Sequence, residues 1–226
     1  MMMMNRARNT VLILGALSQV LTGCGVSKAK VSFNGLNDAP VSTGPGTVGL
    51  KTAANLPAAI EAVTGLSIAN EPALMDLSPG GMTLQRQIEL SRNFLPKEGG
   101  VSELSSTPQL VFTSIGLHAA RIVARKERSM AAGSRVFYGS IDFTQAPSVA
   151  LAPDKISKVL DVVGPRVLQR KLTAEEVLAS KSCVNEQIAE EGTVASANSG
   201  RELANERVVT LCTLGMHLSS MAFLKD

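Results

Sequence analysis

The hydrophobic positions from about residue 52 onward recur at the spacing of amphipathic α-helices. Leu56, Ile60 and Val63 fall at i, i+4 and i+7, with Pro57 in the first turn and Gly65 as the stop. The same reasoning predicts further helices over residues 84–95, 107–130, 154–168, 173–191 and 199–223. The fold class that follows is mainly α, a compact domain of about six helices.

Short motifs set the expected helix boundaries. Thr107 before Pro108 is a start signal, because Thr caps a helix and Pro suits its first position. Thr173–Glu176 and Ser199–Glu202 have the spacing of capping boxes. We expect Gly164–Pro165 to break or kink the helix that contains it.

Residues 131–153 interrupt the helical pattern with two Gly and two Pro. They include the run Val136-Phe137-Tyr138, which suits either a short strand or an ordered loop. The pattern does not decide between these two structures.

The composition limits which residue types can fill the core, and the net charge limits which classes of partner are expected. The chain of 226 residues has no Trp, one Tyr and six Phe, so we expect a core of Leu, Val, Ile, Ala and Met. The formal charge is 22 − 19 = +3, and it falls to 20 − 19 = +1 without Arg6 and Arg8. A nearly neutral chain gives no electrostatic reason to expect nucleic acid as a partner.

The N-terminal segment has the two-part pattern of a secretory signal. Residues 1–9 carry two Arg and no acid, and residues 10–22 are mostly apolar. This apolar stretch is shorter than the about 20 residues that a transmembrane helix needs. We expect residues 1–23 to be a signal peptide, and the sequence leaves the start among Met1–Met4 open.

Leu21-Thr22-Gly23-Cys24 follows directly and resembles the lipobox of bacterial lipoproteins. The resemblance implies that a diacylglycerol is attached to the Cys24 thiol and that cleavage leaves Cys24 as the first residue. Acyl chains such as palmitate hold a protein on a bilayer without a spanning helix. By resemblance to Gram-negative lipoproteins, Gly25 in place of Asp implies the outer membrane rather than the inner membrane. The alternative is an ordinary signal peptide with an accidental Cys.

Residues 24–51 are predicted to form a lipidated, flexible tether. The stretch holds five Gly and two Pro and has neither a helical nor an alternating period. Fully extended, about 26 residues span up to roughly 85–90 Å. The predicted organisation is a signal peptide over 1–23, a tether over 24–51 and a helical domain over 52–226.

A second resemblance covers Arg166–Glu176. Its sequence RVLQRKLTAEE looks like the R-x-x-x-R-x-L-T-x-E-E stretch of helical domains in large secreted proteins that are often joined to c-type cytochrome modules. Residues 218–224 resemble the serine-rich end of the helix that follows that stretch. The resemblance implies a helical accessory domain and carries over no catalytic residue, and the C-x-x-C-H motif of the cytochrome modules is absent from the sequence.

Cys183 and Cys212 fall on the last two predicted helices, 29 residues apart. In an exported protein such a pair predicts a disulfide, because the compartment is oxidising. In the chain-entropy model this bridge stabilises the fold by ~3–4 kcal/mol. The alternative is a pair of buried free thiols.

The two His residues and several Ser residues are candidates for metal binding or catalysis, and each also has a structural explanation. A haem or copper site at His118 or His217 is conceivable, but lone helical His residues are usually structural, so we predict neither a metal nor a cofactor. Ser114, Ser219 and Ser220 lie in no Gly-x-Ser-x-Gly motif, and we predict no catalytic residue.

Arg121, Arg125 and Arg128 recur at i, i+4 and i+7 and form a cationic stripe on one predicted helix. The stripe is either a solvated face that complements the helix C-terminus or a surface for anionic lipid headgroups or an acidic partner.

The predicted function is that of a non-enzymatic scaffold or interaction module, anchored to a membrane of the bacterial envelope through Cys24. Its partners are then the membrane and a protein of the envelope. The alternative is a redox accessory protein of the periplasm, which the cytochrome-associated resemblance and the His and Met residues favour. That alternative predicts a visible absorption band, and a hydrolase would require a Ser and an acid to converge on one of the two His residues.

Overall fold

The computed structural model describes residues 51–69, 71, 82–95, 106–191 and 198–224, which lie in one compact unit, Thr47–Asp226. Within these ranges the regular structure is helical, and no strand is found. The predicted mainly α fold is therefore confirmed. Cys24, the predicted signal peptide and the tether up to residue 50 lie outside the described residues.

The first two described helices are α2 (Leu56–Thr64) and α3 (Leu84–Ser91). Pro57 lies in the first turn of α2, and Gly65 ends the helix with a left-handed φ of 70°, as predicted. The Thr83 hydroxyl accepts the Arg86 amide at 3.1 Å and caps α3. α3 ends at Ser91, earlier than the predicted residue 95.

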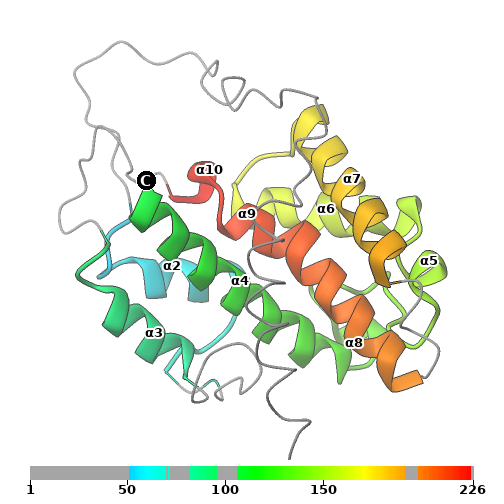
Figure 1. Cartoon of the computed structure of the whole chain (residues 1–226), viewed down its shortest axis with the longest axis horizontal. Coiled ribbons are helices and arrows are strands. Elements are labelled where there is room, and N and C mark those ends of the chain that lie inside the picture. Colours follow the sequence, from blue (N-terminus) through cyan, green and yellow to red (C-terminus); the bar gives the residue numbers. More distant parts are fainter. Residues whose placement is uncertain (1–50, 70, 72–81, 96–105, 192–197, 225–226) are drawn as a thin grey trace, which may run out of the picture. The chain divides into compact units, whose positions relative to one another are not determined.

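The long helix α4 (Ser106–Arg128) lies at the centre of the fold (Figure 1). It packs against α3 and against three later elements, α8 (Asn198–Val209), the π-helical turn η3 (Thr210–Gly215) and α9 (Met216–Leu218). It begins at Ser106, so Thr107 lies inside the first turn instead of capping it, a shift within the usual spread of helix ends. Its buried face comprises Phe112, Ile115, Ala119, Ala120, Ile122, Val123 and Ala124.

The segment after α4 is an ordered loop, which decides between the two structures that the sequence left open. It contains a short 3₁₀ turn, η2 (Ala132–Ser134), and the single-turn helix α5 (Pro147–Ala150). The buried Glu127 carboxylate accepts the amides of Val136, Phe137 and Tyr138 at 2.8–3.1 Å. A side chain thus satisfies the amides that a partner strand would otherwise bind.

The loop is also tied to the end of α4 through Arg135. The Arg135 guanidinium donates to the carbonyl oxygens of Met130 and Ile141 at 3.0 and 2.6 Å. It lies 5.3 Å from the ring centroid of Phe143, a cation–π contact. Two side chains therefore fix the loop: the Glu127 carboxylate accepts its backbone amides, and the Arg135 guanidinium donates to backbone carbonyl oxygens.

The next two helices are α6 (Pro153–Val167) and α7 (Ala174–Glu191). The sequence predicted a break or a kink at Gly164–Pro165; α6 does not break there, since Pro165 lies inside the helix, in its last turn, and the helix continues to Val167. The capping box of α7 is confirmed: the Thr173 amide donates to Glu176 Oε2 at 2.8 Å, and the Glu176 amide donates to Thr173 Oγ1 at 3.2 Å.

The C-terminal helical path consists of α8 (Asn198–Val209), the π-helical turn η3 (Thr210–Gly215), α9 (Met216–Leu218) and α10 (Met221–Leu224). α8 begins at Asn198, so Ser199 lies inside the helix and is not its cap. The widened turn of η3 brings its backbone close to α4, since a Cβ on Gly215 would lie 2.8 Å from Leu117 Cδ2.

The aromatic side chains contribute more to the core than the composition predicted. Phe112, Phe137, Tyr138, Phe143 and Phe223 are all buried. Met82, Met130 and Met216 are half-buried, so these three Met residues border the core rather than fill it. Within the same ranges, no helix combines the length and apolarity that crossing a membrane requires.

Candidate functional site

α7 and η3 hold the cysteine pair that the sequence predicted to form a disulfide. Cys183 and Cys212 are joined at an S–S distance of 2.05 Å, with 5.5 Å between their Cα atoms. Cys212 is fully buried, whereas Cys183 is half-buried. The structure thus pairs the two cysteines rather than leaving two free thiols.

One turn from the disulfide, Ser180 of α7 contacts two side chains of α9. Its Oγ lies 3.6 Å from Met216 Sδ and 3.2 Å from His217 Nε2. Burial lowers the pKa of His217, which Arg170 lowers further and Glu176 opposes. Ser180 and His217 are 0% and 3% exposed, so their contact is an interior one.

The remaining His and Ser candidates have other hydrogen-bond partners. His118 Nδ1 lies 2.5 Å from Gln87 Oε1, and Gln87 Nε2 donates to Ser114 Oγ at 2.7 Å. These bonds join α3 to α4. The hydroxyls of Ser219 and Ser220 each donate at 2.7 Å to a backbone carbonyl three or four residues earlier.

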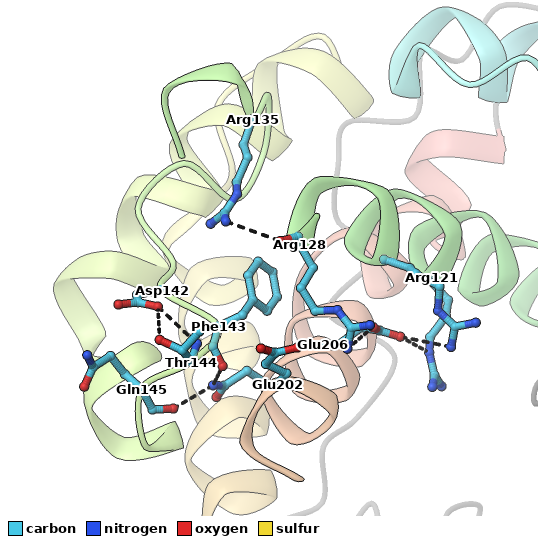
Figure 2. A network of polar contacts seen from close by, with 11 residues as sticks. Arg121, Arg128, Arg135, Asp142, Phe143, Thr144, Gln145, Glu202 and Glu206 are labelled. Carbon is cyan, nitrogen blue, oxygen red and sulfur yellow. Dashed lines mark hydrogen bonds and ion pairs between the residues drawn. The ribbon is translucent and has the colours of Figure 1, made fainter. Parts of the chain in front are cut away.

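The arginine stripe of α4 points toward α8 (Figure 2). Arg121 Nε and Arg125 Nη2 lie 2.7 and 3.4 Å from Glu206 Oε1, and Arg128 Nη1 lies 3.2 Å from Glu206 Oε2. Glu202, one turn earlier on α8, lies 3.9 Å from Arg128. The stripe is neither a solvated face nor a surface for lipid, because its acidic partner belongs to the same chain.

Glu206 is the electrostatic centre of this network. Its side chain is 0% exposed, whereas the three arginines retain 13%, 33% and 24% of their exposure. A carboxylate is tolerated at such a position when charged hydrogen bonds replace its water. The neighbouring Asn205 Nδ2 donates to the carbonyl oxygens of Phe143 and Gln145 at 2.8 and 2.9 Å (Figure 2). Two consecutive residues of α8 therefore bind α4 on one side and the ordered loop on the other.

A cavity of about 310 Å³ opens near the C-terminal ends of α2 and α4. Lys126 Nζ at its edge lies 3.2 Å from Glu71 Oε1. The Arg166 guanidinium lies 5.7 Å from the ring centroid of Phe137. The cavity thus combines an apolar wall with two cationic groups, one of which is paired with Glu71, and with the Glu127 carboxylate. Its lining residues are Thr64, Gly65, Leu66, Val123, Lys126, Glu127, Met130, Val136 and Arg166.

Neither a cluster of metal-ligating side chains in the described residues nor a known relative assigns a function. In the part of the chain that the structure describes, no three His, Cys, Asp or Glu side chains gather as metal ligands. Comparison of the chain with protein-family models, with curated proteins and with solved structures found no match.

Proposed function

We propose that this protein is a lipid-anchored component of the bacterial cell envelope whose helical domain binds a partner rather than converting a substrate. The proposal rests on the sequence Leu21-Thr22-Gly23-Cys24. This sequence ends an apolar stretch, which itself follows an N-terminal segment with two arginines. Acylation of Cys24 places the hydrocarbon chains at the N-terminus of the mature protein, where they insert into one leaflet.

The disulfide supports this location. Disulfides form and persist in oxidising compartments outside the cytoplasm. Cys183 and Cys212 lie at bonding distance in the folded domain, at 2.05 Å between sulfurs. An envelope protein gains from such a bridge because it restrains the unfolded chain in a compartment where the bond is kept oxidised.

The cavity beside α2 and α4 supports a binding role. Arg166 lines it together with apolar side chains such as Leu66 and Val123, and Lys126, paired with Glu71, lies beside it. This combination suits an acidic group attached to an apolar body, so we propose that the partner presents acidic side chains next to apolar ones.

The proposal is tested by the intact mass of the protein purified from its native host, beside Cys24→Ala and the matched control Cys183→Ala. We expect a mass that begins at Cys24 plus acyl groups, lost in Cys24→Ala and retained in Cys183→Ala. Reductant adds about two mass units to the parent, as expected when one disulfide opens to two thiols. An unacylated parent would show that the anchor does not exist.

A further inference from the structure

Lys51, the last residue of the predicted tether, is bound to the C-terminal helix α10. Its amide donates to the Leu224 carbonyl oxygen at 2.7 Å, and its ammonium group donates to the Phe223 carbonyl oxygen. The ammonium group also lies 4.8 Å from the centroid of the Phe223 ring, a cation–π contact. Phe223 and Leu224 are both buried. These contacts therefore fix the place at which the folded domain joins the tether.

This junction lies near the N-terminal end of α4. The Oγ of Ser219, two residues before α10, lies 3.3 Å from the Thr113 carbonyl oxygen, in the first half of α4. Figure 1 shows α10 beside the beginning of α4. The other end of α4 faces α8, since Arg128 lies 3.9 Å from Glu202. A helix of 23 residues is about 33–35 Å long, so the junction and the first turns of α8 lie at opposite ends of α4.

Three large apolar side chains are exposed on elements at the junction end of α4. Leu110, near the start of α4, is 55% exposed, and Leu90 of α3 and Phe94 of the turn after α3 are 50% and 53% exposed. α3 lies against the same half of α4, because Gln87 Nε2 donates to Ser114 Oγ at 2.7 Å. Single exposed apolar residues are common on protein surfaces, whereas several on neighbouring elements indicate contact with an apolar partner.

We propose that this end of the domain, on which Leu90, Phe94 and Leu110 are exposed, rests on the bilayer to which Cys24 is anchored. The partner of this surface is then the lipid itself, at the level of the headgroups and the first acyl carbons. The inference rests on the proposed function, because it requires a lipid anchor at Cys24, and it adds which face of the domain meets the membrane.

The length of the tether favours this orientation. Residues 25–50 separate Cys24 from Lys51, and a flexible chain of ~26 residues has an average reach of roughly 25–30 Å. That reach suffices when the junction faces the bilayer. The reverse orientation holds Lys51 a further length of α4, about 33 Å, from the lipid and stretches the tether beyond its average dimensions. With the junction on the membrane, the cavity near the C-terminal ends of α2 and α4 faces away from the lipid and stays open to a protein partner.

The exposed side chains suit the interface between headgroups and acyl chains. Apolar side chains are stabilised there because they leave water, and an arginine attracts anionic headgroups. Arg92, two residues before Phe94, is exposed. The nearby carboxylate of Glu89 is paired with Arg86 at 3.3 Å. The surface therefore combines apolar side chains with a cation that suits a headgroup phosphate.

A single Trp tests the orientation, because the chain has no Trp of its own. Leu110→Trp and Phe94→Trp place the indole at the proposed contact, and Leu203→Trp is the matched control. Leu203 is 42% exposed and follows Glu202 on α8, so it lies at the opposite end of α4. Trp emission is measured with the full chain on vesicles of phosphatidylethanolamine and phosphatidylglycerol. The vesicles are prepared with and without a phosphatidylcholine brominated on its acyl chains, since bromine quenches Trp only at close range.

The protein is coupled to these vesicles through Cys24, which separates the orientation from the existence of the natural anchor. The sequence holds three Cys, and Cys183 and Cys212 are joined, so Cys24 offers the thiol that reacts with a maleimide lipid. Absence of natural acylation shows in the intact mass of the protein from its native host. The coupled chain still reports which end of the domain meets the lipid.

We expect the brominated lipid to quench Leu110→Trp and Phe94→Trp by about twofold or more and to leave Leu203→Trp unchanged, with equal helical circular dichroism in all three variants. Equal quenching of Leu203→Trp and Leu110→Trp would overturn the orientation. Absence of quenching in both Leu110→Trp and Phe94→Trp would overturn the lipid contact. Blue-shifted emission of these two variants without vesicles, dependent on protein concentration, would assign the surface to a second copy of the chain instead.

Discussion

Replacing the buried carboxylate of Glu206 is the most direct perturbation of the contact between α4 and α8. Glu206→Gln keeps the size of the side chain and removes the charge that faces Arg121, Arg125 and Arg128. Removing one partner of a buried ion pair costs about 3–5 kcal/mol, because the remaining charges lose their compensation. The Gln carbonyl keeps one acceptor, which restores about 1 kcal/mol. We therefore expect the free energy of unfolding to fall by about 2–4 kcal/mol.

The assay is urea unfolding of the oxidised protein at neutral pH, followed by circular dichroism of the helices. Glu202→Gln is the matched control, since it removes the same charge from the same helix. Its carboxylate is 38% exposed and lies 3.9 Å from Arg128, so its removal should cost less than about 1 kcal/mol. The midpoint should therefore move far more for Glu206→Gln than for Glu202→Gln, with an unchanged denaturant slope.

Equal midpoints for the two variants would refute the reasoning. Such a result would mean that the three guanidinium groups find hydration or other partners once Glu206 is neutral. The ion pairs would then define the packing of α4 on α8 without contributing to its stability, an outcome known for other buried ion pairs.

Three further predictions concern other parts of the fold. Glu127→Gln should lower the free energy of unfolding, measured in urea, by about 2–3 kcal/mol. The Glu127 carboxylate accepts three consecutive loop amides, and a side-chain amide cannot replace both of its oxygens. An unchanged urea midpoint would contradict the role given to Glu127. Gly215→Ala should cost about 1–3 kcal/mol and lower Tm, because the new Cβ would clash with the Thr210 carbonyl oxygen and lie 2.8 Å from Leu117 Cδ2. A Tm equal to that of the parent would show that the backbone of η3 relaxes to accept the methyl group. Hydrogen bonds from Arg170 lower the pKa of Glu176 from 4.5 to about 2, so this pair stabilises the fold above pH 4.5 and loses its effect as the pH falls from 4.5 toward 2. Because Arg170 is 42% exposed, we expect a loss of only about 1–2 kcal/mol over that range, and Glu176→Gln, measured by unfolding at each pH, should flatten the decline.

Local signals in the sequence predicted the helices well because their causes are local. Pro57 and Gly65 bound α2 through their own backbone preferences, and the capping box at Thr173 forms both of its expected hydrogen bonds. The same local reasoning placed the start of α4 one residue late and expected Gly164–Pro165 to break or kink α6, which continues to Val167. Pro165 falls in the last turn of α6, and its position relative to the helix end decides its effect.

Features that depend on the packing order of the helices could not be predicted. The sequence shows two patterns of charge. One is the row of three arginines on one predicted helix, and the other is Glu202 with Glu206, one turn apart on another helix. Pairing them requires that α4 and α8 be neighbours, which the periodicity of either helix does not reveal. The π-helical turn η3 was missed for the same reason, since its backbone is shaped by the close approach of α4 near Gly215.

The cysteines were the part of the site that the sequence predicted, because residue type and compartment suffice to pair them. Ser180 was missed, since no motif marks it and only the packing of α7 against α9 brings its hydroxyl to Met216 and His217.

The attachment of α7 combines apolar contacts with one covalent bond. Ser180 and Val184 are its fully buried side chains within the described residues, and the half-buried Val177 and Ile188 also pack against the core. The Cys183–Cys212 bond adds a covalent tie between α7 and η3 to this contact. α4 has a broader buried apolar face and the Glu206 network besides. We therefore expect reduction of the disulfide to loosen α7 before it disturbs the core around α4.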